Sequence, residues 1–235
     1  MRRTILIGDL HGCHDEAVEL LDACAVSESD RVIFLGDLVD RGPRPRQCVE
    51  LAMRHECILG NHEEKHLQQR HRPDEKLSPD HLATRRALGP EHYAYFERLP
   101  PFIDLPEFGA AAVHAGALPG IPVAQQARYH LLHCQNIRPP ETKSYWPSKA
   151  PADFTFWTNH WAGPTKLVFG HSVLTKPLVT PHAVGIDTGA VFGGPLTALV
   201  LPDWKLVQVA SRQPKRARGN GIATYLLQDD VYAYS

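Results

Sequence analysis

The sequence predicts an α/β fold in which a mostly parallel sheet is covered on both faces. Short runs of β-branched and aliphatic residues alternate with amphipathic stretches through the first half of the chain. These runs are continuously apolar, which is typical of strands that are buried on both sides. Several of them end directly before an Asp, an Asn or a His, and ligands bind at the carboxyl ends of strands in such sheets.

The predicted elements follow from these runs in chain order. Strands are expected at Thr4–Ile7, Arg31–Leu35, Cys57–Leu59, Ala110–His114 and Lys166–Phe169. Helices are expected at about Asp15–Cys24, where one face is apolar, and at Pro45–Arg54, which can begin on its proline.

The middle and the end of the chain have different patterns. Glu63 to about Leu99 is polar and helical in pattern with little apolar periodicity, which predicts a helical cap at about 64–99. The last third is expected to form an antiparallel meander with a hairpin turn at Pro202-Asp203 and strands at Ala183–Ile186, Leu196–Leu201, Leu206–Ala210 and Ala223–Leu227. Since no internal repeat is visible, residues 1–235 are expected to form one domain.

The composition narrows the class of protein. A chain of 235 residues with 43% hydrophobic residues can bury a substantial core, and a net charge of −1 does not favour nucleic-acid binding. The five cysteines are scattered without a Cys-x-x-Cys pair, which argues against a disulfide framework. No stretch approaches the roughly 20 apolar residues that span a bilayer. We therefore expect a cytoplasmic protein without membrane or specific nucleic-acid partners.

Five short segments each place a polar side chain directly after a predicted strand. They are Gly8-Asp9-Leu10-His11-Gly12, Gly36-Asp37-Leu38-Val39-Asp40-Arg41-Gly42, Gly60-Asn61-His62-Glu63, Val113-His114-Ala115-Gly116 and Gly170-His171-Ser172. The glycine in each segment lets the backbone turn sharply and approach an ion. Taken singly, these residues would more often be helix caps or core histidines, so their joint occurrence carries the prediction. The mixture of oxygen and nitrogen donors suits manganese, iron or zinc better than calcium.

The five segments, in this order, resemble those of the calcineurin-like metallophosphoesterases. The resemblance covers residues 4 to about 201. Within the family, the sequence is most similar to the branch of phosphoprotein phosphatases and symmetrical diadenosine tetraphosphatases. It implies a four-layer α-β-β-α sandwich with a dinuclear metal site at the strand ends. It also implies that Asp37 bridges the two ions and that the other ligands are Asp9 and His11 for the first ion, and Asn61, His114 and His171 for the second.

The same resemblance implies roles for the residues that would act on the phosphate. His62 would donate a proton to the leaving oxygen, Asp40 would orient His62, and Arg41 would bind phosphoryl oxygens. The branch usually has a second phosphate-binding arginine between the two late histidines. The candidates are Arg128 and Arg138, and the segment Cys134-Gln135-Asn136-Ile137-Arg138 favours Arg138. The remaining histidines, His66 and His81 among them, are expected to be surface or packing residues.

The sequence leaves more than one substrate class possible. The segment 185–194 is similar to the closing motif of symmetrical diadenosine tetraphosphatases, which predicts hydrolysis of diadenosine tetraphosphate into two ADP. The predicted cofactor is a pair of divalent ions, for which manganese is the first choice and iron and zinc are alternatives. The alternative is a serine/threonine or tyrosine phosphoprotein phosphatase, so the partner is a nucleotide or a phosphoprotein. A metal-holding scaffold without catalysis is a third hypothesis. The combination of His62, Asp40 and Arg41 argues against it, since a scaffold needs no proton donor.

Overall fold

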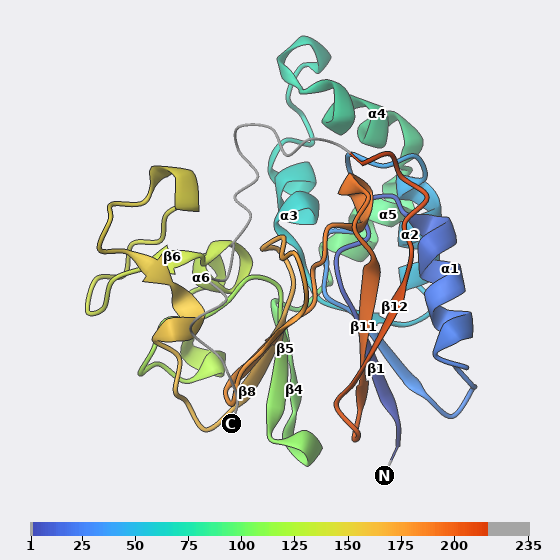
Figure 1. Ribbon diagram of the computed structural model, residues 1–235. Helices are drawn as coiled ribbons and strands as arrows, with labels where there is room; N and C mark the ends of the chain where they lie inside the picture. The colour runs from blue at the N-terminus through green and yellow to red at the C-terminus, as the bar shows by residue number, and fades with distance from the viewer. Residues whose placement is uncertain (1, 216–235) are drawn as a thin grey trace.

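Two five-stranded β-sheets pack face to face in the computed structural model, which describes residues 2–215 (Figure 1). The first sheet has the strand order β12 (Lys205–Val209), β11 (Leu196–Leu201), β1 (Thr4–Ile7), β2 (Arg31–Phe34) and β3 (Glu56–Cys57). The second has the order β4 (Phe102–Leu105), β5 (Ala110–Val113), β8 (Lys166–Phe169), β10 (Ala183–Gly185) and β9 (Leu178–Val179). Within each sheet three neighbouring strands are parallel, and the other two are antiparallel.

Strand β1 shows why its apolar run has no polar positions. Successive side chains of a strand point to opposite faces of the sheet. Ile5 and Ile7 belong to the core that includes residues of helices α1 (His14–Ala23) and α2 (Pro45–Ala52), whereas Leu6 belongs to the core that is shared by residues of the two sheets. Both faces are therefore buried, as the sequence predicted.

Helices cover the outer faces of the two sheets. Helices α1 (His14–Ala23) and α2 (Pro45–Ala52) lie on the outer side of the first sheet (Figure 1). Among residues 2–215, the outer side of the second sheet carries α6 (Arg128–His133), the two-stranded sheet of β6 (Asn136–Ile137) and β7 (Thr155–Phe156), and short helical turns. The predicted four-layer α-β-β-α sandwich is confirmed, with one thin outer layer.

The predicted cap region folds into three helices. They are α3 (Asn61–Gln68), α4 (Pro79–Ala87) and α5 (Pro90–Phe96). In Figure 1, α4 lies at the top of the molecule above α3. Tyr93 and Phe96 of α5 are buried, and Phe96 joins the core beneath the first sheet. The last of these helices thus contributes to the core, because its aromatic side chains face inward.

The predicted meander is wrong in one respect. Strand β10 lies in the second sheet, parallel to β8, whereas β11 and β12 form an antiparallel pair in the first sheet. The chain crosses between the sheets after Ile186, and local spacing of apolar runs does not report such a crossing. The hairpin turn after β11 is confirmed, and the predicted strand Ala223–Leu227 lies outside the described residues. No described helix has both the length and the apolar character needed to cross a bilayer.

Candidate metal centre

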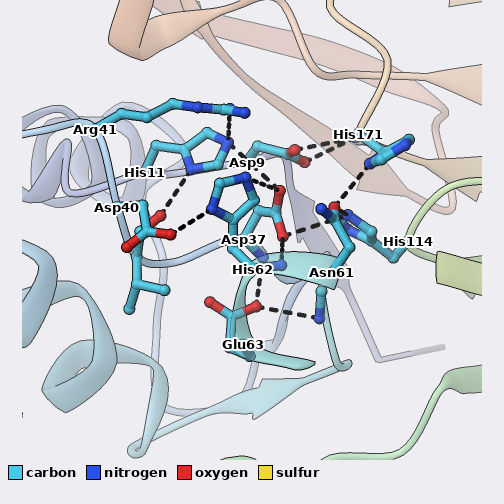
Figure 2. Close-up of polar contacts among 12 residues, drawn as sticks. Asp9, His11, Asp37, Asp40, Arg41, Asn61, His62, Glu63, His114 and His171 are labelled. Carbon is cyan, nitrogen blue, oxygen red and sulfur yellow. Dashed lines mark hydrogen bonds and ion pairs between the residues drawn. The ribbon is translucent and has the colours of Figure 1, made fainter. Parts of the chain in front are cut away.

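The ends of five strands converge at one edge of the two packed sheets, and the predicted ligands meet there (Figure 2). The first sheet contributes the segments after β1, β2 and β3, and the second contributes those after β5 and β8. These segments carry, in chain order, Asp9, His11, Asp37, Asn61, His114 and His171. All six predicted ligands are therefore brought together.

The backbone of the site is held in an unusual conformation. Seven non-glycine residues between 2 and 215 have a positive φ, and five of them belong to the site. They are His11, Asp37, Asp40, Arg41 and His171, with φ between 43° and 70°. Side chains disfavour this left-handed region, so its concentration here indicates that the fold enforces the arrangement at some cost.

Two glycines give the ligands the space they occupy. A Cβ atom at Gly170 would lie 2.0 Å from Oδ1 of Asp9, and one at Gly60 would lie 2.2 Å from the backbone nitrogen of Asp37. Any larger residue at either position would displace a carboxylate that is part of the site. The glycines of the motifs are thus required by close approach of the segments to one another.

Asp37 occupies the centre of the cluster. Its Oδ2 lies 3.4 Å from Nε2 of His11, and its Oδ1 lies 3.4 Å from Nε2 of His114. The backbone N–H of His62 donates to Oδ1 at 2.9 Å and fixes the orientation of the carboxylate. One carboxylate oxygen therefore faces each half of the site, which is the geometry that a bridging ligand needs.

The two imidazoles next to Asp37 are presented as neutral ligands. Nδ1 of His11 lies 2.8 Å from the carbonyl oxygen of Val39, and Nδ1 of His114 lies 2.7 Å from that of Leu35. In each case Nδ1–H can donate outward, which leaves the lone pair of Nε2 facing Asp37. Burial lowers the pKa of both histidines, and the charge of Arg41 lowers that of His11 further.

Asn61 and His171 complete the half of the site on the side of the second sheet. Oδ1 of Asn61 lies 2.9 Å from Nε2 of His114 and 2.9 Å from Nδ1 of His171. Asp37, His114 and His171 also satisfy the spacing of a metal site. Four donor atoms, from segments that follow strands of both sheets and from the start of α3, therefore converge on the same small volume.

Asp9 lies in the other half and is nearly inaccessible to solvent. Its two carboxylate oxygens accept hydrogen bonds from the backbone N–H of His171 at 3.1 and 3.0 Å. Burial raises its pKa well above the ordinary value, and the neighbouring Asp187 and Asp37 raise it further. Buried carboxylates that repel one another are stabilised by cations, so the donor set fits divalent metal ions.

Glu63 also belongs to the site, although no role was predicted for it from the sequence. It is fully buried, and its carboxylate accepts from the backbone N–H groups of Asp37 at 2.8 Å, Leu38 at 2.9 Å and Gly60 at 3.1 Å (Figure 2). Burial and the charge of Asp37 raise its pKa to about 8. Glu63 joins the segment after β2 to the start of α3. Its third position in that helix, the position of a capping Glu, was the available signal.

His62 lies on the open side of the cluster and is held by Asp40. Nδ1 of His62 lies 2.7 Å from Oδ2 of Asp40, and Nε2 of His62 points toward Asp37, 3.9 Å from its Oδ2. Burial alone would raise the pKa of Asp40, but hydrogen bonds from His62, His66 and His81 lower it well below its usual range. The free nitrogen of His62 is thus directed at the metal-binding side.

Two buried histidines lie behind Asp40. Nε2 of His66 lies 2.8 Å from Oδ1 of Asp40, and the ring of His81 stacks on that of His66 with centroids 3.6 Å apart. Asp40, His66 and His81 also have the spacing of a metal site. However, the two rings are within 10° of parallel, so their in-plane lone pairs do not converge on one ion. Both side chains were expected to be surface or packing residues, and both are packed inside.

Of the predicted phosphate-binding arginines, Arg41 lies beside the proposed ligands, whereas Arg138 forms ion pairs with other residues. Nη1 of Arg41 lies against Nε2 of His11, and its guanidinium is 5.5 Å from the ring centre of Phe192. Arg138, the favoured second phosphate ligand, instead forms ion pairs with Glu141 and Asp153.

The other candidate, Arg128, lies closer to the predicted ligands. Its Nε donates to Oε1 of Glu64 at 3.0 Å, and Oε2 of Glu64 is 3.1 Å from Nε2 of His133. The His133 ring centre is 6.4 Å from that of His171. These contacts favour Arg128 over Arg138, because they connect Arg128 to a predicted metal ligand.

Comparisons with known proteins agree with this geometry. The sequence model of the family described as calcineurin-like phosphoesterase matches residues 2–184. An asymmetrical bis(5′-nucleosyl)-tetraphosphatase of Oceanobacillus iheyensis is 30% identical to the chain, over 89% of this chain and 92% of the relative. A crystal structure assigned as a diadenosine tetraphosphatase is similar at a TM-score of 0.74 and 29% identity, over 89% of this chain and 94% of that one.

A more distant structure shares the fold. It is a protein serine/threonine phosphatase from Saccharomyces cerevisiae, with a TM-score of 0.56 and 16% identity over 92% of this chain and 82% of that one. At this identity the likeness concerns the arrangement of strands and helices alone.

Proposed function

The chain belongs to the calcineurin-like phosphoesterase family, and on that premise we propose that it is a bis(5′-nucleosyl)-tetraphosphatase that cleaves its substrate asymmetrically. Family membership makes it a metal-dependent phosphoester hydrolase. The observation that carries the proposal is the placement of Asp37, with one oxygen toward each half of the site and the His62–Asp40 pair beside it.

The ligand assignment of the proposal follows the two halves of the site. Asp9 and His11 would hold one ion, Asn61, His114 and His171 would hold the other, and Asp37 would hold both. Two divalent ions there, for which we propose manganese with iron or zinc as alternatives, would activate water and neutralise charge on the phosphoryl group.

The residues of the chain would perform the remaining steps. His62 would donate a proton from Nε2 to the leaving phosphate oxygen, while Asp40 accepts from Nδ1–H and holds the ring in orientation. Arg41 and Arg128 would bind phosphoryl oxygens with their planar guanidinium groups. Arg138 is replaced by Arg128 in this proposal, because Glu141 and Asp153 already engage it.

The position of the cut departs from the sequence prediction. Similarity at the motif level suggested symmetrical cleavage into two ADP, whereas the relative that covers most of the chain is named as asymmetrical. Asymmetrical cleavage of diadenosine tetraphosphate yields ATP and AMP. We adopt that outcome, and we keep the cytoplasm as the proposed location because all five cysteines are free and buried.

The test is hydrolysis of diadenosine tetraphosphate with manganese, followed by chromatography of the nucleotides. ATP and AMP in equal amounts are expected, two ADP would restore the symmetrical cut, and no hydrolysis with any of the three metals would contradict the proposal. Phosphoserine, phosphothreonine and phosphotyrosine peptides serve as the comparison. Faster turnover of a peptide than of the dinucleotide would make the chain a phosphoprotein phosphatase.

A further inference from the structure

A row of four aromatic rings runs outward from the second half of the metal centre. The ring centres of His171 and Trp146 are 5.6 Å apart, those of His171 and His133 are 6.4 Å apart, and Tyr129 stacks on His133 at 5.0 Å. Trp146 and Tyr129 therefore form the two ends of a row, and one of its two inner rings, His171, is a predicted metal ligand.

Both ends of the row are open to solvent. Trp146 is 45% exposed and Tyr129 is 56% exposed, and they are two of only five large hydrophobic side chains exposed among residues 2–215. Trp157 and Trp161, by contrast, are buried in the core of the second sheet. Packing explains the buried tryptophans, whereas exposed aromatic faces beside a polar centre are typical of ligand contact.

A cleft adjoins the row on the side of Tyr129. It has a volume of about 400 Å³, within the usual range for small-molecule sites, and is lined by Tyr129, His130, Thr142, Lys143, Ser144 and Tyr145. Aromatic faces, one lysine and several hydroxyl groups are suited to a nucleoside, whose base stacks and whose ribose and phosphates accept hydrogen bonds.

We propose that Trp146 and Tyr129, at the two ends of the row, each offer a stacking platform to a nucleobase of the substrate. The inference rests on the proposed function, since it names the part of the nucleotide that these residues bind. Trp146 is in ring contact with His171, so little more than a ribose and one phosphate fits between a stacked base and the metal centre. That short span agrees with an asymmetrical cut, which leaves one phosphate between the ribose and the broken bond.

Calorimetry on the manganese-loaded protein separates the base from the phosphates. The ligands are α,β-methylene-ADP and methylenediphosphonate, which share the uncleavable phosphonate and differ by the nucleoside. The protein is expected to prefer the nucleotide by about ten-fold, and Trp146→Ala to abolish most of that preference, because stacking on one aromatic ring is worth about this factor. Tyr129→Ala tests the other end of the row. Trp146→Phe should retain most of the preference, and Met53→Ala, another exposed apolar residue, should retain all of it.

Two results would overturn the platform. One is an unchanged preference in both alanine variants. The other is an equal loss of affinity for both ligands, which would mean that Trp146 acts on His171 alone. Failure of the proposed function looks different, because the preference for the nucleotide would persist in a protein that leaves diadenosine tetraphosphate intact.

A different observation concerns the stacked pair His66 and His81. His66 is fully buried and reaches Oδ1 of Asp40, while His62 holds Oδ2 of the same carboxylate. The ring of His81, 1% exposed, covers the face of His66 and has Nδ1 at 3.6 Å from Oδ2 of Asp40. Asp40 is thus fixed from both of its oxygens.

We infer that His66 is a positioning residue that acts through Asp40 on the proton donor His62. With Nε2–H donated to Oδ1, the carboxylate of Asp40 has one rotational setting, and its Oδ2 stays aligned with Nδ1 of His62. His81 holds the ring of His66 by stacking, so His81→Phe, which keeps an aromatic face, should preserve the alignment.

The test compares His66→Leu with His66→Gln, whose terminal amide can still donate to Asp40. His66→Leu should slow hydrolysis of phenyl phosphate about ten-fold and that of p-nitrophenyl phosphate less than about two-fold, because p-nitrophenolate hardly needs a proton to leave. His66→Gln should recover most of the loss, with metal content unchanged in both. A loss that is equal for all esters, or equal in the two variants, would overturn the positioning role.

Discussion

The two regions that supply the metal centre differ in how much sequence lies between their ligands. Residues 9–63 carry four of the proposed ligands and the proposed proton donor at three strand ends within one sheet, with short connections. The second sheet carries the other two proposed ligands, His114 and His171, and the segment between them contains α6, the small β6–β7 sheet and several turns. In our proposal the first region performs the chemistry that every phosphoester requires. The second region would then distinguish the part of the substrate beyond the phosphate.

This contrast predicts two kinds of mutational effect. Substitutions in the first region should reduce hydrolysis of all substrates or change its dependence on the leaving group. Substitutions between residues 115 and 165 should alter affinity for one substrate and leave others unaffected. The predictions below run from the largest expected effect to the smallest.

His62→Asn should have the largest effect on an ester whose leaving group is strongly basic. Loss of a general acid costs about 10²–10⁴ in rate, so hydrolysis of phenyl phosphate should fall by that factor. The rate for p-nitrophenyl phosphate should fall far less, since its leaving group is a weak base. Steady-state kinetics on both esters with the same metal measure the difference. Equal losses on the two substrates would remove His62 from the role of proton donor.

Glu63→Gln should weaken the first region without touching substrate. The amide cannot accept all three backbone N–H groups that the carboxyl group of Glu63 binds, and leaving a buried N–H group without its acceptor costs about 2 kcal/mol. Groups that hold metal ligands in place typically change metal affinity by about 10–100-fold when altered. Urea unfolding and titration with manganese measure both quantities. A variant with unchanged metal affinity would show that Asp37 keeps its position without Glu63.

The two arginines of the second region offer a matched pair. Arg128→Ala should raise KM for diadenosine tetraphosphate by about ten-fold, the factor expected for one charge-assisted contact to phosphate. Arg138→Ala should change it by less than about two-fold, because Glu141 and Asp153 hold that side chain at the surface. The reverse result would return the second phosphate contact to Arg138.

The smallest effect concerns acid stability and His66. Burial lowers the pKa of His66 below its value in the unfolded chain, where it is about 6.5. A histidine of this kind contributes stability above the unfolded pKa, and that contribution is lost as the pH falls. The free energy of unfolding should therefore decline between about pH 7.5 and 5.5, and His66→Leu should make the decline shallower. A parallel decline in both proteins would show that His66 does not titrate in this range.

The positions of the proposed ligands at the strand ends could be predicted from the sequence because they are local properties. Asp9, Asp37 and His114 follow apolar strands by one to three residues, and a glycine lies within two residues of each. The long-range consequence, convergence of two sheets at one edge, came from the resemblance of the motifs in order. The crossing of β10 and β11 between sheets had no such local mark.

The parts that sequence missed depend on contacts between distant segments. His66 and His81 become a unit only because α3 and α4 pack against the turn that carries Asp40. Their spacing in the chain matches no metal or catalytic motif. Arg128 and Arg138 both lie between the two late histidines and both form ion pairs. What separates them is that Glu64, the partner of Arg128, also contacts His133 next to His171. The sequence indicates that Glu63 is a capping residue at the start of a helix, but it does not indicate the contact of Glu63 with the segment after β2.

The central claim is that one carboxylate, Asp37, joins two ions into a single centre. Elemental analysis of protein stripped with chelator and reloaded with manganese tests it directly. The wild-type chain should retain two ions. Asp37→Asn should bind both ions more weakly than the wild type does, because both halves of the site lose the shared carboxylate. His114→Ala is the control and should lose one ion. Retention of one tightly bound ion by Asp37→Asn would contradict the bridging role.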